Sequence, residues 1–382
     1  MGATGGLDSN ILRAYDIRGI VGQTLQIEDA FAIGRAFATV SAARLGRQPK
    51  LCVGYDGRLS SPDLEAALVS GLVSSGADVL RSGLGPTPML YFAVKKLDRD
   101  GGVMVTGSHN PPDFNGFKLT LSGFPFWDQD IQILGKIISD ADFADRQGKS
   151  EKVSVENDYV ERLSAEYTSN QRLSVAWDAG NGAAGKALDA IDSAFRKNNV
   201  PVTFVKVHHQ PDGTFPNGIP NPLLPENRAD TAQAVKDNAA DFGIAWDGDF
   251  DRCFLFDAEG NFIEGYYIVG LLAEAFLDKN SNSKIIYDPR VYWNTEDIVN
   301  NAGGEPIKCK TGHAFIKQRM RDEDAVYGGE MSAHHYFRDF AYCDSGMIPW
   351  LLVAERLCQS GQTLSSLIDA RIEAYPASGE IN

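Results

Sequence analysis

An acidic pentapeptide carries the strongest chemical signal in the sequence. Asp247, Asp249 and Asp251 occupy alternate positions directly after the apolar run 244–246. On an extended segment alternate side chains point to the same side, so we expect the three carboxylates to converge. Hard oxygen ligands of this kind suit a divalent cation, and Mg²⁺ is favoured because it binds through one or two carboxylates together with a phosphate. A solvated acidic turn is the alternative, which repulsion between three like charges disfavours.

A serine follows another apolar run, within the segment 106–111. Gly107 permits a close approach of backbone to ligand, and Pro111 stiffens the exit of the loop. Ser108 is expected at the carboxyl end of a strand, where α/β proteins bind ligands, and is a candidate nucleophile or phosphate carrier. His109 is a poor candidate for its base, because adjacent side chains on an extended loop point to opposite sides. A purely structural turn is the alternative.

A third polar row carries Glu330, Ser332 and His334 at alternate positions. Strand-like alternation is expected to send an acceptor, a hydroxyl and a titratable group to one face. Such a row suits sugar hydroxyls and a phosphate, whereas the alternative is a polar edge strand.

A glycine-rich turn at 180–185 matches the dinucleotide-binding pattern G-x-G-x-x-G between a strand and a helix. The acidic residue expected about 20 positions later is missing. The turn also resembles a phosphate-binding P-loop, but Ala187 stands where a Ser or Thr must hold Mg²⁺. A tight strand-to-helix turn is therefore the simpler interpretation.

Short apolar runs alternate with amphipathic stretches along the whole chain, which is typical of sheets covered by helices. The expected strands are 50–55, 77–81, 102–106, 173–177, 202–207, 242–246, 284–287 and 325–327. Three of them end on an aromatic residue followed by Asp56, Asp178 or Asp288. This recurrence predicts an α/β protein with three successive α/β domains of related topology, built on mixed, mostly parallel sheets, with the active site in the cleft between them.

Composition restricts the possible partners. The chain of 382 residues has a formal net charge of −15, which disfavours binding to nucleic acid or to anionic membrane surfaces. No apolar run is long enough for a transmembrane helix. Five scattered cysteines indicate a reducing, cytoplasmic location. An anionic substrate needs a local basic pocket, and its candidates are Arg13, Arg18, Lys118, Arg252, Arg290, Lys310 and His313.

Four motifs in this order resemble the α-D-phosphohexomutases, most closely their bacterial phosphomannomutase/phosphoglucomutase branch. They are the segments 13–19, 106–111, 247–252 and 329–334. The resemblance covers essentially the whole chain. It implies a phosphoserine domain at 1–152, a metal-binding domain at 153–257 and a sugar-binding domain at 258–369. A stub of a fourth, phosphate-binding domain is implied at 370–382, and loss of that domain is expected to impair turnover.

The resemblance also implies roles for individual residues. The implied catalytic residues are Ser108, His109, Lys118, Arg18, Arg252 and His334. The implied substrate-binding residues are Tyr15, Arg290, Lys310, Gly312, His313, Glu330 and Ser332. The implied ligands of one Mg²⁺ are Asp247, Asp249, Asp251 and Ser108, the last through its phosphate.

The activity implied by the resemblance is interconversion of mannose 6-phosphate and mannose 1-phosphate, extended to glucose phosphates. It would proceed through a phosphoserine and a hexose 1,6-bisphosphate, which also serves as activator. The expected partner is a small phosphosugar, with no nucleic acid and no membrane, and the expected state is a monomer or weak dimer. Two alternatives are a non-catalytic remnant that binds phosphosugar and Mg²⁺, and a nicotinamide-dependent oxidoreductase that uses Gly180 to Gly185.

Overall fold

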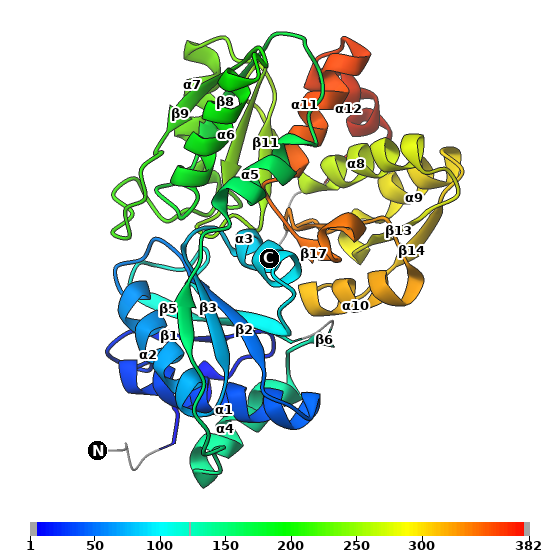
Figure 1. Ribbon diagram of the computed structural model, residues 1–382. Helices are drawn as coiled ribbons and strands as arrows, with labels where there is room; N and C mark the ends of the chain where they lie inside the picture. Colours follow the sequence, from blue (N-terminus) through cyan, green and yellow to red (C-terminus); the bar gives the residue numbers. More distant parts are fainter. Residues whose placement is uncertain (1–5, 122–123, 378–382) are drawn as a thin grey trace.

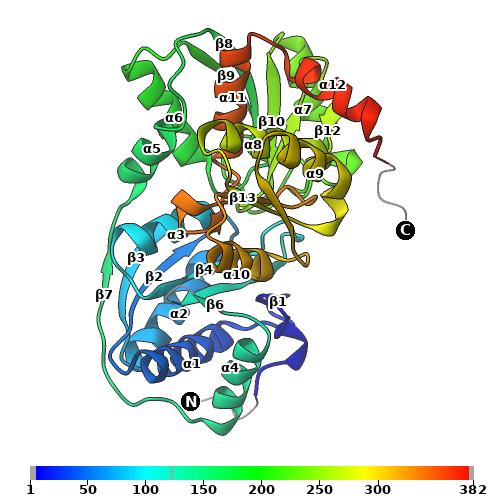
Figure 2. The same cartoon turned by 90° about the vertical axis from the view of Figure 1, so that its right-hand side faces the viewer.

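Three helix-covered β-sheets follow one another along the chain (Figures 1 and 2). The computed structural model describes residues 6–121 and 124–377. Residues 1–5 of the first expected domain and 378–382 of the expected last segment lie outside this part. The three sheets confirm the expected succession of α/β domains with mixed sheets, while the exact domain boundaries stay predictions. Within the described ranges, every helix is too short or too polar to cross a membrane.

The first sheet has the strand order β1-β5-β4-β2-β3-β7, and β6 pairs with β5. Its strands are β1 (Ile17–Ile20), β2 (Lys50–Tyr55), β3 (Asp78–Leu84), β4 (Gly101–Val105), β5 (Phe114–Leu121), β6 (Phe124–Pro125) and β7 (Ser150–Lys152). Its helices are α1 (Ile27–Leu45), α2 (Ser61–Ser74), α3 (Thr87–Lys96) and α4 (Gln129–Asp140). Strands β2, β3, β4 and β7 run parallel, and β5 is antiparallel to β4 and β1.

Strand β2 shows why this sheet is buried on both faces. Leu51 and Val53 point into the core formed with α1 and α2, whereas Cys52 between them belongs to the core on the α3 side. Alternate side chains of a strand point to opposite faces, so a continuous apolar run fits a strand with helices on both sides.

The second sheet has the order β12-β11-β10-β8-β9, with β8, β9 and β10 parallel and β11 and β12 antiparallel. Its strands are β8 (Leu173–Asp178), β9 (Val202–Val207), β10 (Phe242–Trp246), β11 (Cys253–Phe256) and β12 (Phe262–Ile263). The helices of this part are α5 (Glu156–Ser164), α6 (Gly185–Lys197) and α7 (Ala229–Asp237).

The third sheet has the order β14-β13-β15-β16-β17, again with a parallel part and an antiparallel edge. Its strands are β13 (Lys284–Tyr287), β14 (Glu305–Lys308), β15 (Tyr327–Gly329), β16 (His335–Phe337) and β17 (Cys343–Asp344). Its helices are α8 (Gly265–Lys279), α9 (Tyr292–Asn301) and α10 (His313–Glu323), and two further helices follow, α11 (Pro349–Ser360) and α12 (Leu364–Ala374).

Helix α11 follows the third sheet but returns to the second one (Figure 1). Its Trp350 is fully buried, and the ring lies 5.2 Å from that of Trp177 in β8 and 6.0 Å from that of Phe204 in β9. The second and third domains therefore share one apolar core.

The strands place three predicted motifs at equivalent positions. Ser108 follows β4, Asp247 follows β10 and Glu330 follows β15, each at the carboxyl end of a strand. The expected runs 50–55, 202–207, 242–246 and 284–287 coincide with β2, β9, β10 and β13, and the other four are displaced by one to three residues at an end.

Helices α1 and α2 approach each other so closely at Gly71 that a side chain does not fit at this position. A Cβ added to Gly71 would lie 2.0 Å from the carbonyl oxygen of Phe31. A Gly71→Ala substitution gains about 1 kcal/mol of helix propensity but adds overpacking, which costs typically about 1–3 kcal/mol and here meets rigid backbone. We expect a net decrease of about 2 kcal/mol in the free energy of unfolding, measured by urea titration with circular dichroism. The control is Gly6→Ala, whose added Cβ meets nothing nearer than 4.0 Å; equal midpoints for the two variants would contradict the prediction.

Candidate active site

The serine loop places a hydroxyl against an acidic loop of the neighbouring domain. Ser108 is buried, and its Oγ donates to Oδ2 of Asp247 at 3.2 Å. Its Oγ also lies 3.1 Å from Nδ1 of His109. The expectation that these two adjacent side chains diverge was wrong, because Ser108 has a φ of +50° and the loop is not extended there. The serine and the imidazole are therefore neighbours. Burial and the nearby guanidinium of Arg252 lower the pKa of His109 to about 2, so its ring is neutral at neutral pH.

The acidic loop brings three carboxylates together by turning. Asp247, Asp249 and Asp251 are buried, with one oxygen of each within 4.8 Å of the others. The expected convergence is confirmed, but the expected extended backbone is wrong: Phe250 has a φ of +61°, and its ring stacks on Trp246 at 5.2 Å. Burial and the other two carboxylates raise the pKa of Asp247 well above its ordinary value.

Glycines allow the acidic loop to pack this tightly. A Cβ on Gly248 would lie 2.5 Å from the carbonyl oxygen of Ser108, and one on Gly182 would lie 2.7 Å from the carbonyl oxygen of Gly248. The glycine-rich turn after β8 therefore supports the acidic loop from behind, which favours the tight-turn interpretation of the segment 180–185.

Lys118 of β5 supplies the positive charge nearest to these acids. Its Nζ donates to Oδ2 of Asp249 at 2.6 Å and to Oδ2 of Asp251 at 2.5 Å. Burial alone would lower the pKa of Lys118, but the three carboxylates raise it well above its ordinary value. Burial would raise the pKa of Asp251, but Lys118 together with His334 and Arg252 holds that pKa well below its ordinary value.

Two carboxylate oxygens in this cluster are left without a hydrogen bond. Oδ1 of Asp249 and Oδ1 of Asp251 are buried and accept none from the described residues. Buried carboxylate oxygens without a donor are costly, whereas a bound cation satisfies them. The cluster therefore fits a hard divalent cation.

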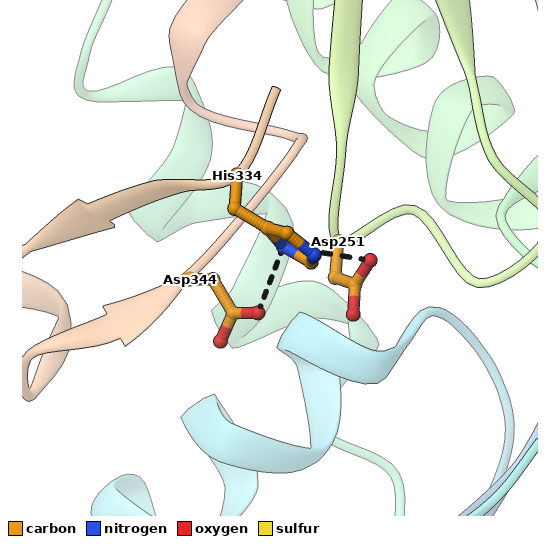
Figure 3. Close-up of side chains that lie close together, drawn as sticks. All are labelled: Asp251, His334 and Asp344. Atoms are coloured by element: carbon orange, nitrogen blue, oxygen red, sulfur yellow. Dashed lines mark ion pairs between the residues drawn. The ribbon is translucent and has the colours of Figure 1, made fainter. Parts of the chain in front are cut away.

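Arg252 and His334 join the acidic loop to the third domain. Nε of Arg252 donates to Nε2 of His334 at 3.1 Å, and the two residues form an isolated β-bridge. Nδ1 of His334 lies 3.8 Å from Oδ1 of Asp251 and 3.3 Å from Oδ2 of Asp344, between the two carboxylates (Figure 3). Lys317 contacts the other oxygen of Asp344 at 2.5 Å. Arg252 and Asp251 of the second domain thus meet His334, Asp344 and Lys317 of the third at the domain boundary.

Arg18 lies behind the serine loop. Its Nη1 donates to the carbonyl oxygen of Gly107 at 2.5 Å and to Oδ1 of Asn110 at 3.0 Å, and its Nη2 contacts Asp16. The guanidinium therefore adds positive charge directly beside Ser108.

The predicted row of Glu330, Ser332 and His334 is a loop and not a strand. β15 ends at Gly329 and β16 begins at His335, so the five residues between them form a tight connection, and strand alternation does not apply. Glu330 is buried and accepts from the Tyr336 hydroxyl at 2.5 Å, whereas His334 faces the acidic loop. Ser332 lies half-buried on the same loop.

The other predicted substrate residues surround Glu330. The Gly312 N–H donates to Oε2 of Glu330 at 3.3 Å, and Nη2 of Arg290 lies 3.7 Å from the same oxygen. Arg290 is also paired with Asp288 at 2.5 Å. These contacts place the loop 310–313 and the short turn Pro289–Val291, which precedes α9, next to Glu330.

Aromatic contacts between the first and third domains hold the loop 310–313 in place. Tyr15 lies edge-on to His313 at 5.5 Å, and Trp127 lies edge-on to Phe315 at 4.8 Å. Nζ of Lys310 is 4.4 Å from the centre of the Phe315 ring. Figure 2 shows α10 directly above β6, which agrees with contacts between these elements.

Several residues beside the predicted site were missed by sequence reasoning. They are Asp56, Arg58, Thr87, Lys317 and Asp344. Of these, only Asp56 and Arg58 left a signal, because they follow an expected strand. The others are single polar residues with distant partners: Thr87 bonds Asp249 of the second domain, and Lys317 pairs with Asp344, 27 positions further along the third domain.

Lys118 and a divalent cation should compete for the same carboxylates. Without metal, Lys118→Met leaves the buried acids without their partner, and breaking such a pair costs about 3–5 kcal/mol. We expect a lower melting temperature for this variant in EDTA, and a larger rise on addition of MgCl₂ than the wild type shows. The control is Lys136→Met, which removes an exposed pair with Asp140 of small energetic weight. An equal magnesium-induced rise in all three proteins would overturn this interpretation.

Family comparisons agree with this geometry. Residues 9–145, 157–260 and 264–375 match, in turn, the alpha/beta/alpha domains I, II and III of phosphoglucomutase/phosphomannomutase. A phosphomannomutase of Escherichia coli is 54% identical over 97% of this chain and 82% of its own length. A protein of Xanthomonas campestris described as phosphohexose mutases is 51% identical over the same shares.

A solved structure supports the same assignment. The crystal structure of a phosphoglucomutase/phosphomannomutase family protein from Burkholderia thailandensis aligns with a TM-score of 0.89 and 37% identity, covering 95% of this chain and 80% of the other. With all three successive domains matched, the chain belongs to the phosphoglucomutase/phosphomannomutase family of phosphohexomutases, which are isomerases.

Proposed function

We propose that the chain is a phosphomannomutase that interconverts mannose 6-phosphate and mannose 1-phosphate through a phosphoserine at Ser108 and a hexose 1,6-bisphosphate. Glucose phosphates form a second substrate pair. The observation that carries the proposal is the 3.2 Å contact between Ser108 Oγ and Asp247 inside a buried carboxylate cluster. Relatives that are more than half identical and named phosphomannomutase support the choice of sugar.

Asp247, Asp249 and Asp251 are the residues that would hold Mg²⁺, together with a phosphate oxygen on Ser108. The unpartnered oxygens of Asp249 and Asp251 support this assignment. When bound, the ion supplies positive charge to the phosphoryl group. A solved relative from Aspergillus fumigatus was crystallised with N-acetylglucosamine 6-phosphate and magnesium, which is in keeping with a metal in this fold.

The transfer itself requires positioning and charge more than covalent assistance. A free hydroxyl oxygen of the sugar phosphate bonds to phosphorus as the bond from phosphorus to Ser108 Oγ breaks, and the proton of the sugar hydroxyl returns to Oγ. In this proposal Lys118 and His334 carry this proton, and Arg18 and Arg252 balance the phosphoryl charge. The bisphosphate then turns end for end, and the reverse transfer restores phosphoserine.

Glu330 is the proposed acceptor for sugar hydroxyls. The Tyr336 hydroxyl and the Gly312 N–H fix its carboxylate, while Arg290 adds positive charge on the same side. Ser332 and the loop residues Lys310 and His313 complete the proposed sugar site. Burial and the neighbouring Lys317 lower the pKa of His313 to about 3, so it is a neutral hydrogen-bonding group.

Phosphorylation of Ser108 gives the most direct test. After incubation with glucose 1,6-bisphosphate and MgCl₂, we expect the intact mass of the wild type to rise by one phosphoryl group. Ser108→Ala should show no increase, whereas Ser193→Ala, a change on the exposed face of α6, should behave like the wild type. A phosphoryl group that persists in Ser108→Ala would place the carrier elsewhere.

Glu330→Gln tests the sugar site. Hydrogen bonds to charged groups contribute about 1.5–3 kcal/mol, so we expect kcat/KM for mannose 1-phosphate to fall about 10- to 100-fold. Steady-state kinetics in a coupled assay measure this effect. The matched control is Glu323→Gln. Glu323 is the last residue of α10, and its carboxylate pairs with Lys284. An equal, small change in both variants would remove Glu330 from the sugar site.

A further inference from the structure

We propose that Asp56 and Arg58 are positioning residues that fix the loop 106–111 in the conformation that presents Ser108 for phosphoryl transfer. The inference rests on the proposed function of Ser108. Neither residue belongs to the site expected from the sequence. Both lie in the turn that follows β2, and β2 is the neighbour of β4 in the first sheet.

The side chain of Arg58 binds backbone carbonyl groups on the far side of the loop. Its side chain is only 1% exposed. Nη2 donates to the carbonyl oxygens of Ser108 at 2.8 Å and Asn110 at 2.6 Å, and Nη1 donates to those of Pro111 at 2.5 Å and Phe114 at 3.0 Å. One guanidinium thus satisfies three carbonyl groups of the loop 106–111 and a fourth at the start of β5. Only the planar, multi-donor fork of arginine can do this, since a lysine ammonium offers three donors at one point.

Asp56 binds the near side of the same loop. Its Oδ2 accepts from Oγ1 of Thr106 at 2.8 Å and from the N–H of Gly107 at 3.0 Å. The same oxygen lies 3.2 Å from Nε of Arg58, so the two charged groups neutralise each other while each holds one end of the loop. A Cβ on Gly107 would lie 2.2 Å from Nε of Arg58, which explains why glycine precedes the serine.

The loop needs this support because its backbone is strained. A φ of +50° at Ser108 is uncommon for a residue with a side chain, and such conformations persist when surrounding contacts over-determine them. The carbonyl oxygen of Ser108 is one of those that Arg58 binds. Loss of the guanidinium would leave buried carbonyl groups unpaired and would allow Ser108 to relax away from Asp247.

Residues of the second domain cover the flat face of the Arg58 guanidinium. The guanidinium carbon lies 5.0 Å from the centre of the Phe215 ring, and a Cβ on Gly213 would lie 2.6 Å from the N of Leu59. The edge of the guanidinium is thus directed to the serine loop and its face to the domain that carries the acidic loop. Arg58 therefore fixes Ser108 relative to both domains that meet at the cation cluster.

The test compares Arg58→Lys and Arg58→Met with Arg81→Met. Arg81 lies in the same domain and forms a two-point pair with the buried Glu65, so its loss disturbs the fold without touching the serine loop. Each phosphoenzyme is prepared with glucose 1,6-bisphosphate, checked by intact mass and mixed with mannose 6-phosphate. The first-order decay of the phosphorylated mass is then followed. This rate constant is independent of the folded fraction, so destabilisation alone does not change it.

A misplacement of about 1 Å can cost about 100-fold in rate, so we expect the transfer rate constant to fall about 100-fold in Arg58→Met. In Arg58→Lys it should fall at least about tenfold, because the charge remains but the fork is lost. Hydrogen exchange of the amides at 106–114 should accelerate in both variants, and Arg81→Met should match the wild type in both measurements. If Arg58→Met does not fold, the transfer rate and the loop exchange of Arg58→Lys alone decide whether the positioning role holds.

Contrary outcomes separate the two claims. If the wild type and Arg81→Met are phosphorylated and Arg58→Lys transfers as fast as they do, the positioning role is wrong and the proposed function stands. A folded Arg58 variant that cannot be phosphorylated, while Arg81→Met can, supports the role. If the wild type itself takes up no phosphoryl group, the proposed function fails, and unchanged loop exchange in Arg58→Lys would then refute the loop-fixing role as well.

Discussion

Three like charges buried at one point determine how the domains meet. Asp247, Asp249 and Asp251 would repel one another in a low-dielectric interior without nearby positive charge. The first domain contributes Lys118 to this balance, and the second contributes Arg252. The third contributes Lys317, which pairs with Asp344, and also places the imidazole of His334 between Asp251 and Asp344. Each domain thus supplies part of one electrostatic arrangement, and none of them could form it alone.

The acidic loop that carries Asp247, Asp249 and Asp251 is also held by uncharged groups of the first domain. The N–H of Thr87 donates to the carbonyl oxygen of Asp249 at 2.9 Å, and the Thr87 hydroxyl donates to its carboxylate at 2.5 Å. Thr87 begins α3, so the positive end of that helix faces the acid. The acidic loop therefore lies where backbone amides, a helix end and side-chain cations all favour negative charge.

Sequence reasoning succeeded where local patterns decide structure. The apolar runs located β2, β10 and β13 to the residue, because strands buried on both faces need continuous apolar side chains. The β-branched run 202–207 located the edge strand β9, whose Thr203 and Lys206 are exposed. The acids and the hydroxyl at strand ends were correctly brought together, although β4 and β10 belong to different sheets, because the carboxyl ends of these strands meet at the boundary between the first and second domains. The errors arose in loops: Ser108 and Phe250 adopt positive φ, and the segment 330–334 is a turn. These conformations depend on tertiary contacts, such as the Arg58 hydrogen bonds and the stacking on Trp246, that period-2 alternation does not describe.

Helix α11 has a consequence for the order in which the protein can be completed during synthesis. The ribosome releases β8 and β9 long before Trp350, yet that indole covers Trp177 and Phe204. Until α11 has emerged, the middle sheet exposes an aromatic surface that water disfavours. The domain that stands second along the chain is consequently completed only after all strands of the third have been synthesised, when α11 can cover its aromatic surface.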